Sequence, residues 1–338
     1  MSLPAGIRNY SYAEDTAVFR TRTQKWLLAI VLLALLFSPL WLSNYWLGMV
    51  SLIGITIIAA TGLNMITGYA GQLSFGYAGF IAVGAYTSAI LTGKYNQPFL
   101  IGLICAGLLS GIIGMLLSLP LWKIKGYYMA IITIAAQLII LWVINHWVSM
   151  TGGTAGLIVS APSIGAWDLS SATGQYFLIV IIMVLTVFFA NNLVRTRTGR
   201  AFIAVRDNER AAQAMGINLL RNKMLAFFIG CAMAGTAGAL MAHWSGSING
   251  NMFSFSESFF YIAILIIGGF GNMWGVIPGA IILRLLTNQL APAIQGKSMQ
   301  PTDVPSVVAL IALAIVAVLI LILIPARRKE GWRRLKGQ

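Results

Sequence analysis

Charged residues are scarce in this chain of 338 residues, where 9% of positions are Asp, Glu, Lys or Arg and 59% are hydrophobic. A soluble globular domain carries about 25% charged residues, so this composition excludes that class. The hydrophobic residues gather into runs of about 20, which is the length that a helix needs to cross a bilayer. We therefore expect an all-α polytopic membrane protein.

Cysteine and histidine are equally rare, with two of each. Cys105 and Cys231 lie inside hydrophobic runs without disulfide or metal spacing, which indicates packing residues. His146 and His243 are nearly a hundred positions apart, so we expect packing or interfacial roles and no metal site. An integral membrane enzyme would need a nucleophile, base or metal cluster on one side of the membrane, and the sequence shows none.

The sequence also lacks a nucleotide-binding loop of the GxxxxGK[ST] type. Gly296, Lys297 and Ser298 match its end, but Ala291 stands where its first glycine belongs. Rows of intramembrane acids, which ion-coupled carriers use, are missing too, and Arg284 is the one charge that we place inside a span. If the chain is a transporter, the scarcity of internal charges favours an energy source outside the membrane helices. The alternative is an ion-coupled secondary transporter.

Hydrophobic run length predicts about ten transmembrane helices. They are expected at residues 27–43, 48–66, 76–93, 99–121, 127–147, 176–194, 224–244, 256–270, 273–291 and 306–325. With both termini cytoplasmic, all 22 basic residues except Lys94, Lys297 and Arg284 fall on the inner side, as the positive-inside rule requires. The net charge of +14 thus indicates orientation against anionic lipids and no nucleic-acid partner.

This topology divides the chain into a cytoplasmic N-terminal segment at 1–26, a transmembrane domain at 27–325 and a basic cytoplasmic tail at 326–338. Within the domain, residues 148–175 form the longest outer loop, with Trp167 and Asp168 near its middle. We expect a re-entrant segment, a docking surface for a soluble partner, or a plain connector with an interfacial tryptophan. Glu257 and Asp303 are also placed on the outer side.

Glycine interrupts two of the hydrophobic runs, which indicates discontinuous helices. Interrupted helices and polar side chains at membrane depth are tolerated where they line a cavity or are covered by protein. Close helix packing through small residues is the alternative, and the two interpretations are compatible. In TGLNMITGYAGQLSFGYAGF the candidate pathway residues are Asn64, Thr67, Gly68, Gln72 and Ser74, with helix-break or packing glycines at Gly71 and Gly76. In IGGFGNMWGVIPGA, a predicted tight inner turn, the helix-break or packing glycines are Gly268, Gly269, Gly271 and Gly275.

The loop at 195–223 is the one long polar interval between hydrophobic runs and holds seven of the 22 basic residues. Asp207 and Asn208 are N-cap types, Glu209 suits the positive end of a helix dipole, and Gly216 suits a helix end, so we predict a short helix over 208–215. The apolar stripe on this helix consists of Ala211, Ala212 and Met215. The stripe favours docking into a groove on another protein, although a solvated loop that only sets orientation remains open.

Three stretches together resemble the permeases of bacterial branched-chain amino-acid ABC importers, in particular the M-type subunits of Liv systems. They are GLNMITGYAGQLSFGYAGFIAVGAYTSA, GRAFIAVRDNERAAQAMGIN followed by KMLAFFIGCAMAGTAGAL, and IGGFGNMWGVIPGA. The resemblance covers most of residues 48–290. It implies a type II ABC importer fold in the bacterial inner membrane and transport of leucine, isoleucine and valine, or of urea, short amides or other amino or organic acids.

The resemblance also implies partners and a coupling element. The partners are a second related permease in a heterodimer, two ABC ATPase subunits that bind ATP and Mg, a periplasmic substrate-binding protein and membrane lipids; the chain itself binds no cofactor and is no enzyme. The implied ATPase-coupling residues are Arg206, Asp207, Asn208, Glu209, Ala211, Ala212, Met215 and Gly216. Here the glycine follows the glutamate by seven residues, an interval that departs from other importer classes.

Overall fold

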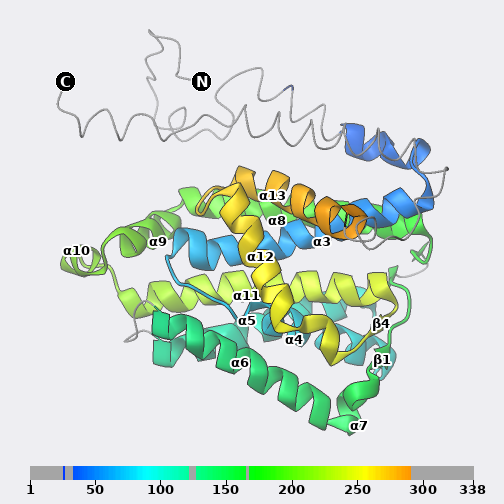
Figure 1. Ribbon diagram of the computed structural model, residues 1–338, viewed down its shortest axis with the longest axis horizontal. Coiled ribbons are helices and arrows are strands. Elements are labelled where there is room, and N and C mark those ends of the chain that lie inside the picture. Colours follow the sequence, from blue (N-terminus) through cyan, green and yellow to red (C-terminus); the bar gives the residue numbers. More distant parts are fainter. Residues whose placement is uncertain (1–25, 27–32, 122–126, 165–166, 291–338) are drawn as a thin grey trace.

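A computed structural model gives the fold and describes residues 26, 33–121, 127–164 and 167–290. The helices are η1 (Ser38–Leu40), α3 (Asn44–Leu63), η2 (Asn64–Tyr69), α4 (Tyr77–Gly93), α5 (Phe99–Leu121), α6 (Tyr127–His146), α7 (Val148–Thr151), η3 (Gly153–Ala155), α8 (Ala172–Arg195), α9 (Arg197–Asp207), α10 (Glu209–Ala214), α11 (Leu219–Ser245), η4 (Gly250–Phe253), α12 (Phe255–Gly268), α13 (Met273–Leu285) and η5 (Leu286–Leu290). The long helices run side by side in one bundle, with α10 at one end and α7 at the other (Figure 1).

The predicted helical membrane class is confirmed. Within the described ranges, six helices are long and apolar enough to cross a membrane, and two shorter apolar helices cover Tyr77–Gly93 and Met273–Asn288. These eight helices match eight of the ten predicted spans. The span at 306–325, residues 27–32 of the one at 27–43, and the terminal segments at 1–26 and 326–338 lie outside the described residues except Trp26. The count of ten therefore stays a prediction.

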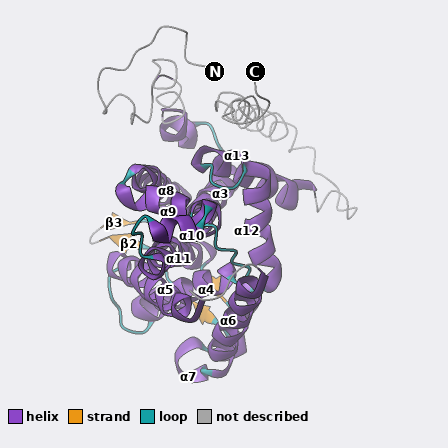
Figure 2. Ribbon diagram, turned by 90° about the vertical axis from the view of Figure 1, so that its left-hand side faces the viewer, coloured by secondary structure: helices purple, strands orange, loops and turns teal. Residues whose placement is uncertain are grey.

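Helix α11 lies at the centre of the bundle and packs most extensively against α5, α4 and α3 (Figure 2). Its glycines allow these close approaches. A β-carbon on Gly235 would collide with the carbonyl of Ala106 in α5, and one on Gly238 would collide with the carbonyl of Ile81 in α4. These crossings show close packing through small residues, because backbones that touch leave no room for side chains.

Helix α3 is the most enclosed of the spans. The helix Asn44–Tyr69 is 89% buried inside the described chain, whereas α8, which is the more hydrophobic of the two, is only 11% buried. Helix α8 packs against α3 and leaves most of its surface outward. In a membrane an apolar surface is stable against lipid or protein alike, so hydrophobicity alone does not place a helix at the centre.

The predicted discontinuity follows α3. Helix α3 continues into the π-helical η2, the chain then runs irregularly through residues 70–76, and α4 begins at Tyr77. Two backbone donors at this start are taken by side chains of other helices: Phe75 N donates to Thr133 Oγ1 of α6 (3.0 Å) and Ala78 N donates to Ser258 Oγ of α12 (2.9 Å). Helix α4 therefore begins inside the bundle, where protein groups replace water as hydrogen-bond partners.

Described residues of the predicted 148–175 loop lie at the end opposite α10 (Figure 1). Its strand β1 (Leu157–Ile158) pairs antiparallel with β4 (Ser247–Ile248), which follows α11, and β2 (Ser163–Ile164) pairs with β3 (Trp167–Asp168). His243 of α11 anchors the segment, since its ring nitrogens contact Ser88 Oγ (3.0 Å) and the carbonyl of Ser160 (2.8 Å). The packing role expected for His243 is confirmed, and a docking role for the segment stays a prediction.

Close helix crossings predict how two glycines respond to alanine. Gly238→Ala should destabilise the purified protein by about 1–3 kcal/mol through overpacking against Ile81. Gly48→Ala is the matched control, because its β-carbon would meet nothing nearer than Trp244 at 4.0 Å, and it should leave stability unchanged or raise it by up to about 1 kcal/mol. Thermal unfolding in detergent measures both, and equal unfolding temperatures would contradict the described crossing of α4 and α11.

Candidate functional site

The polar loop at 195–223 folds into two helices at one end of the bundle. The predicted helix over 208–215 is confirmed as α10, and Asn208 Oδ1 caps it by accepting from Ala211 N (3.1 Å). Helix α9 before it was not predicted. Its signal was present in the sequence, because Thr196 caps its start and the buried Phe202 and Val205 stand three positions apart.

The apolar stripe predicted on α10 is only partly correct. Gly216, with a φ of +80°, ends the helix as predicted, and Met215 is 83% exposed. Ala211 is exposed as well, but Ala212 is buried within the chain. Ala212 faces inward because α10 packs on α9 and α11, so it offers no surface to a partner. The outward apolar surface of α10 is therefore limited to Ala211 and Met215 among the three.

Glu209 ties α10 to the centre of the bundle. Its Oε1 lies 2.8 Å from Nζ of Lys223, a residue that is only 3% exposed in the first turns of α11. A buried ammonium requires such a partner, because an unpaired charge away from water is strongly destabilising. The carboxylate expected to meet an ATPase is thus engaged by the chain itself, and Lys223, fourteen positions away, carried no local signal of this contact.

Arg206 joins the loop to the discontinuous helix. From the end of α9 its Nη1 donates to the carbonyl of Gly68 in η2 (2.8 Å), while its Nη2 lies 3.0 Å from Asp207 Oδ1. Gly71 and Gly271 leave the space that this side chain fills. Their φ values are +68° and +72°, and added β-carbons would meet Arg206 Cγ at 2.6 Å and Arg206 Nη1 at 2.8 Å, respectively. Two of the predicted residue sets, coupling and pathway, therefore meet at one arginine.

Asn64 connects η2 to the turn between α12 and α13. Its Oδ1 accepts from Gly271 N (2.9 Å), and its Nδ2 lies 3.8 Å from the sulfur of Met273. Gly269 takes a φ of +86° in the same turn, and β-carbons on Gly268 and Gly275 would collide with each other's carbonyls. The predicted tight turn is confirmed. We call the assembly of Arg206, Gly68, Asn64 and Gly271 the arginine junction.

The remaining pathway candidates lie next to the junction and are buried. Thr67 Oγ1 donates to the carbonyl of Gln72 (3.1 Å). The side-chain amide of Gln72 and the hydroxyl of Ser74 are also buried, and within the described chain neither finds a hydrogen-bond partner. A β-carbon on Gly76 would collide with the carbonyl of Thr133. These residues are thus enclosed by the described chain, and a pathway role for them stays a prediction.

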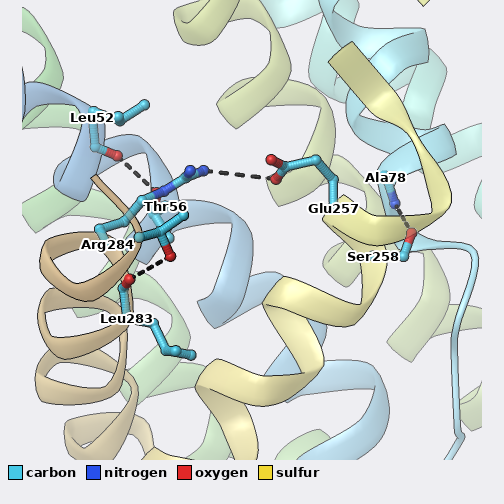
Figure 3. A network of polar contacts seen from close by, with 8 residues as sticks. Leu52, Thr56, Ala78, Glu257, Ser258, Leu283 and Arg284 are labelled. Carbon is cyan, nitrogen blue, oxygen red and sulfur yellow. Dashed lines mark hydrogen bonds and ion pairs between the residues drawn. The ribbon is translucent and has the colours of Figure 1, made fainter. Parts of the chain in front are cut away.

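A second polar group lies deeper in the bundle, and it corrects two expectations. Arg284 of α13 is not the lone charge in the membrane region, since Glu257 Oε2 of α12 lies 3.8 Å from its Nη2 (Figure 3). Arg284 Nε also donates to Thr56 Oγ1 (2.8 Å), at the middle of the Asn44–Tyr69 helix. Glu257 therefore lies near the depth of Thr56, and not at the outer surface where we expected it.

The part of the chain that the structure describes holds no cluster of three His, Cys, Asp or Glu side chains suited to a metal ion. Its polar groups are instead arranged as connections between helices: Glu209 with Lys223, Arg206 with Gly68, and Arg284 with Glu257. Such an arrangement is suited to holding and moving helices relative to one another.

Comparison with known proteins agrees with this geometry. Residues 45–324 match the family described as "Branched-chain amino acid transport system / permease component". The high-affinity branched-chain amino acid transport system permease protein LivM of Escherichia coli is 33% identical over 287 residues, covering 78% of this chain and 68% of that protein. A probable LivM of Methanocaldococcus jannaschii is 28% identical over 264 residues, covering 68% and 76%.

The related permease protein LivH of Escherichia coli is 26% identical over 248 residues, covering 68% of this chain and 79% of that protein. No solved structure gives a significant match. The family match spans the discontinuous helix, the α9–α10 loop and the α12–α13 turn. This chain therefore belongs to the family of permease components of branched-chain amino acid transport systems.

Proposed function

We propose that this chain is the permease subunit of an ATP-driven importer, and that an ATPase subunit docks on α10. The observation that carries the proposal is a pair of contacts from helices α9 and α10 to the inside of the bundle. Glu209 binds Lys223 at the start of α11, and Arg206 binds Gly68 in the discontinuous helix. A displacement of α10 is thereby passed to the central helix and to the arginine junction, as alternating access between two arrangements of the helices requires.

The proposed assembly contains more than this chain. Two kinds of permease, named LivM and LivH, resemble it, which supports a heterodimer of related subunits. Two ATPase subunits that bind ATP and Mg would act on the α10 end. We place this end and both termini on the cytoplasmic side of a bacterial inner membrane. A periplasmic binding protein would deliver the solute to the opposite end. In this assembly the chain contributes movement and a path, and no hydrolysis of its own.

The proposed cargo is leucine, isoleucine and valine. The family description and the names of the relatives support this choice. Urea, short amides or other amino or organic acids are the alternative cargo. The Glu257 carboxylate at membrane depth is the one observation that favours an ion-coupled carrier instead. Uptake of leucine into liposomes that contain the two permeases, with and without the ATPases, separates these mechanisms, and gradient-driven uptake without any ATPase would exclude ours.

Met215 tests docking on α10. Because its side chain is 83% exposed, Met215→Arg should leave the fold intact but reduce co-purification of the ATPases roughly tenfold or more, as loss of an apolar anchor does. Ile158→Arg is the matched control: it introduces the same side chain at an 89% exposed position at the other end of the bundle. If both variants retained the ATPases equally, α10 would not be the docking element.

Arg206 tests the transmission step separately. Arg206→Ala should leave the assembly and its ATP hydrolysis in place but lower uptake roughly tenfold or more, because a hydrogen bond from a charged group contributes about 1.5–3 kcal/mol. Arg200→Ala is the control on the same helix, since Arg200 Nη1 donates only to the nearby carbonyl of Arg195. The leucine-to-ATP ratio in proteoliposomes is the measurement, and an unchanged ratio in Arg206→Ala would contradict this role.

A further inference from the structure

Arg284 and Glu257 bring two opposite charges to the middle of the bundle, and the proposed movement of α10 gives them no task. Arg284 is 7% exposed and lies where α3, α12 and α13 meet. Its partner Thr56 lies at the midpoint of the Asn44–Tyr69 helix. Charged side chains at such depth are expensive, and in transport proteins they face partners or the solute path.

The guanidinium of Arg284 is held in a fixed orientation. Its Nε donates to Thr56 Oγ1, and the Thr56 hydroxyl itself donates to the carbonyl of Leu52 (2.8 Å) (Figure 3). One face of the guanidinium covers the ring of Phe260, with 4.4 Å between Cζ and the ring centroid. A side-chain hydrogen bond with the buried Tyr261 of α12 also holds the guanidinium, whose Nη2 lies 3.8 Å from Glu257 Oε2.

Glu257 does not form a short hydrogen bond with the Nη2 edge of the guanidinium. The distance of 3.8 Å from Oε2 to Nη2 exceeds the roughly 2.7–2.9 Å of a charge-assisted hydrogen bond. The Glu257 side chain is 32% exposed, and a carboxylate at membrane depth is not stable against lipid tails. Its exposed side must therefore face water or protein. A pair retained only to join α12 to α13 would be expected to form the short contact.

We infer that Arg284 and Glu257 form a transit site for a zwitterionic amino acid, in which the Arg284 guanidinium binds the α-carboxylate and the Glu257 carboxylate binds the α-ammonium. This inference rests on the proposed function as an amino-acid permease and selects among its solutes. A zwitterion carries both charges a few ångströms apart and is complementary to the pair. Urea and short amides carry no charge for either group, so the site favours amino acids over them.

The test uses the complete assembly of both permeases and both ATPases in lipid nanodiscs, without the binding protein. Bound labelled leucine is displaced by leucine, by 4-methylpentanoate, which lacks the ammonium, or by 3-methylbutylamine, which lacks the carboxylate. Glu257→Gln should weaken the binding of leucine and 3-methylbutylamine roughly tenfold or more and leave the binding of 4-methylpentanoate unchanged. Arg284→Met should weaken the binding of leucine and 4-methylpentanoate and leave the binding of 3-methylbutylamine unchanged. Ser256→Ala, an exposed neighbour on α12, is the control.

A single substitution leaves one charge unpaired, so the double variant Glu257→Gln with Arg284→Met guards against a folding defect. It should assemble and lose leucine binding. The inference is overturned if wild-type assembly binds no leucine, if the double variant binds it normally, or if single variants weaken all three compounds equally. ATP-driven leucine uptake by the wild-type assembly with its binding protein is measured in parallel. Its absence would reject the proposed function, whereas uptake with an unaltered binding pattern would reject the transit site alone.

Discussion

The structure depends on one constraint: where a membrane helix is broken, the freed backbone groups must find partners within the protein. The break between α3 and α4 meets this requirement with groups from distant parts of the chain. Thr133 and Ser258 accept from the start of α4, and Arg206 donates to the carbonyl of Gly68 at the end of η2. The positions of α6, α12 and α9 around the break follow from these bonds.

The same bonds give the fold its mechanical connections. A neutral hydrogen bond between membrane helices contributes only about 0.6–2 kcal/mol, and one from a charged group about 1.5–3 kcal/mol, so each contact can be exchanged while the others hold the helices together. At the arginine junction, Arg206 and Asn64 link the α9–α10 loop, the discontinuous helix and the α12–α13 turn. The glycines at these crossings let the backbones touch, which makes the junction compact and places the loop within one side chain of the break.

The polar groups divide into two sets by depth. The junction and the Glu209–Lys223 pair lie at the α10 end, where a soluble partner can reach them. Arg284 and Glu257 lie halfway along the bundle, where only solute, water or another membrane subunit can reach them. Both sets fit the proposed assembly, in which partners move the permease from one end and a net-neutral amino acid passes at the middle of the bundle. The chain therefore needs few ionisable groups in total, in agreement with its 9% of charged residues.

The sequence by itself determined the features that depend on neighbouring residues: eight of the ten predicted apolar helices from run length, the caps of α10 at Asn208 and Gly216, the break before α4, and the family. The tertiary structure decided which helix is enclosed, because lipid and protein stabilise an apolar surface alike and the more hydrophobic α8 is the less buried of α3 and α8. It also decided that Ala212 is buried and that Glu257 faces Arg284. Arg206 and Gly68 are 138 positions apart, and no local periodicity encodes a contact between side chain and backbone over such a distance.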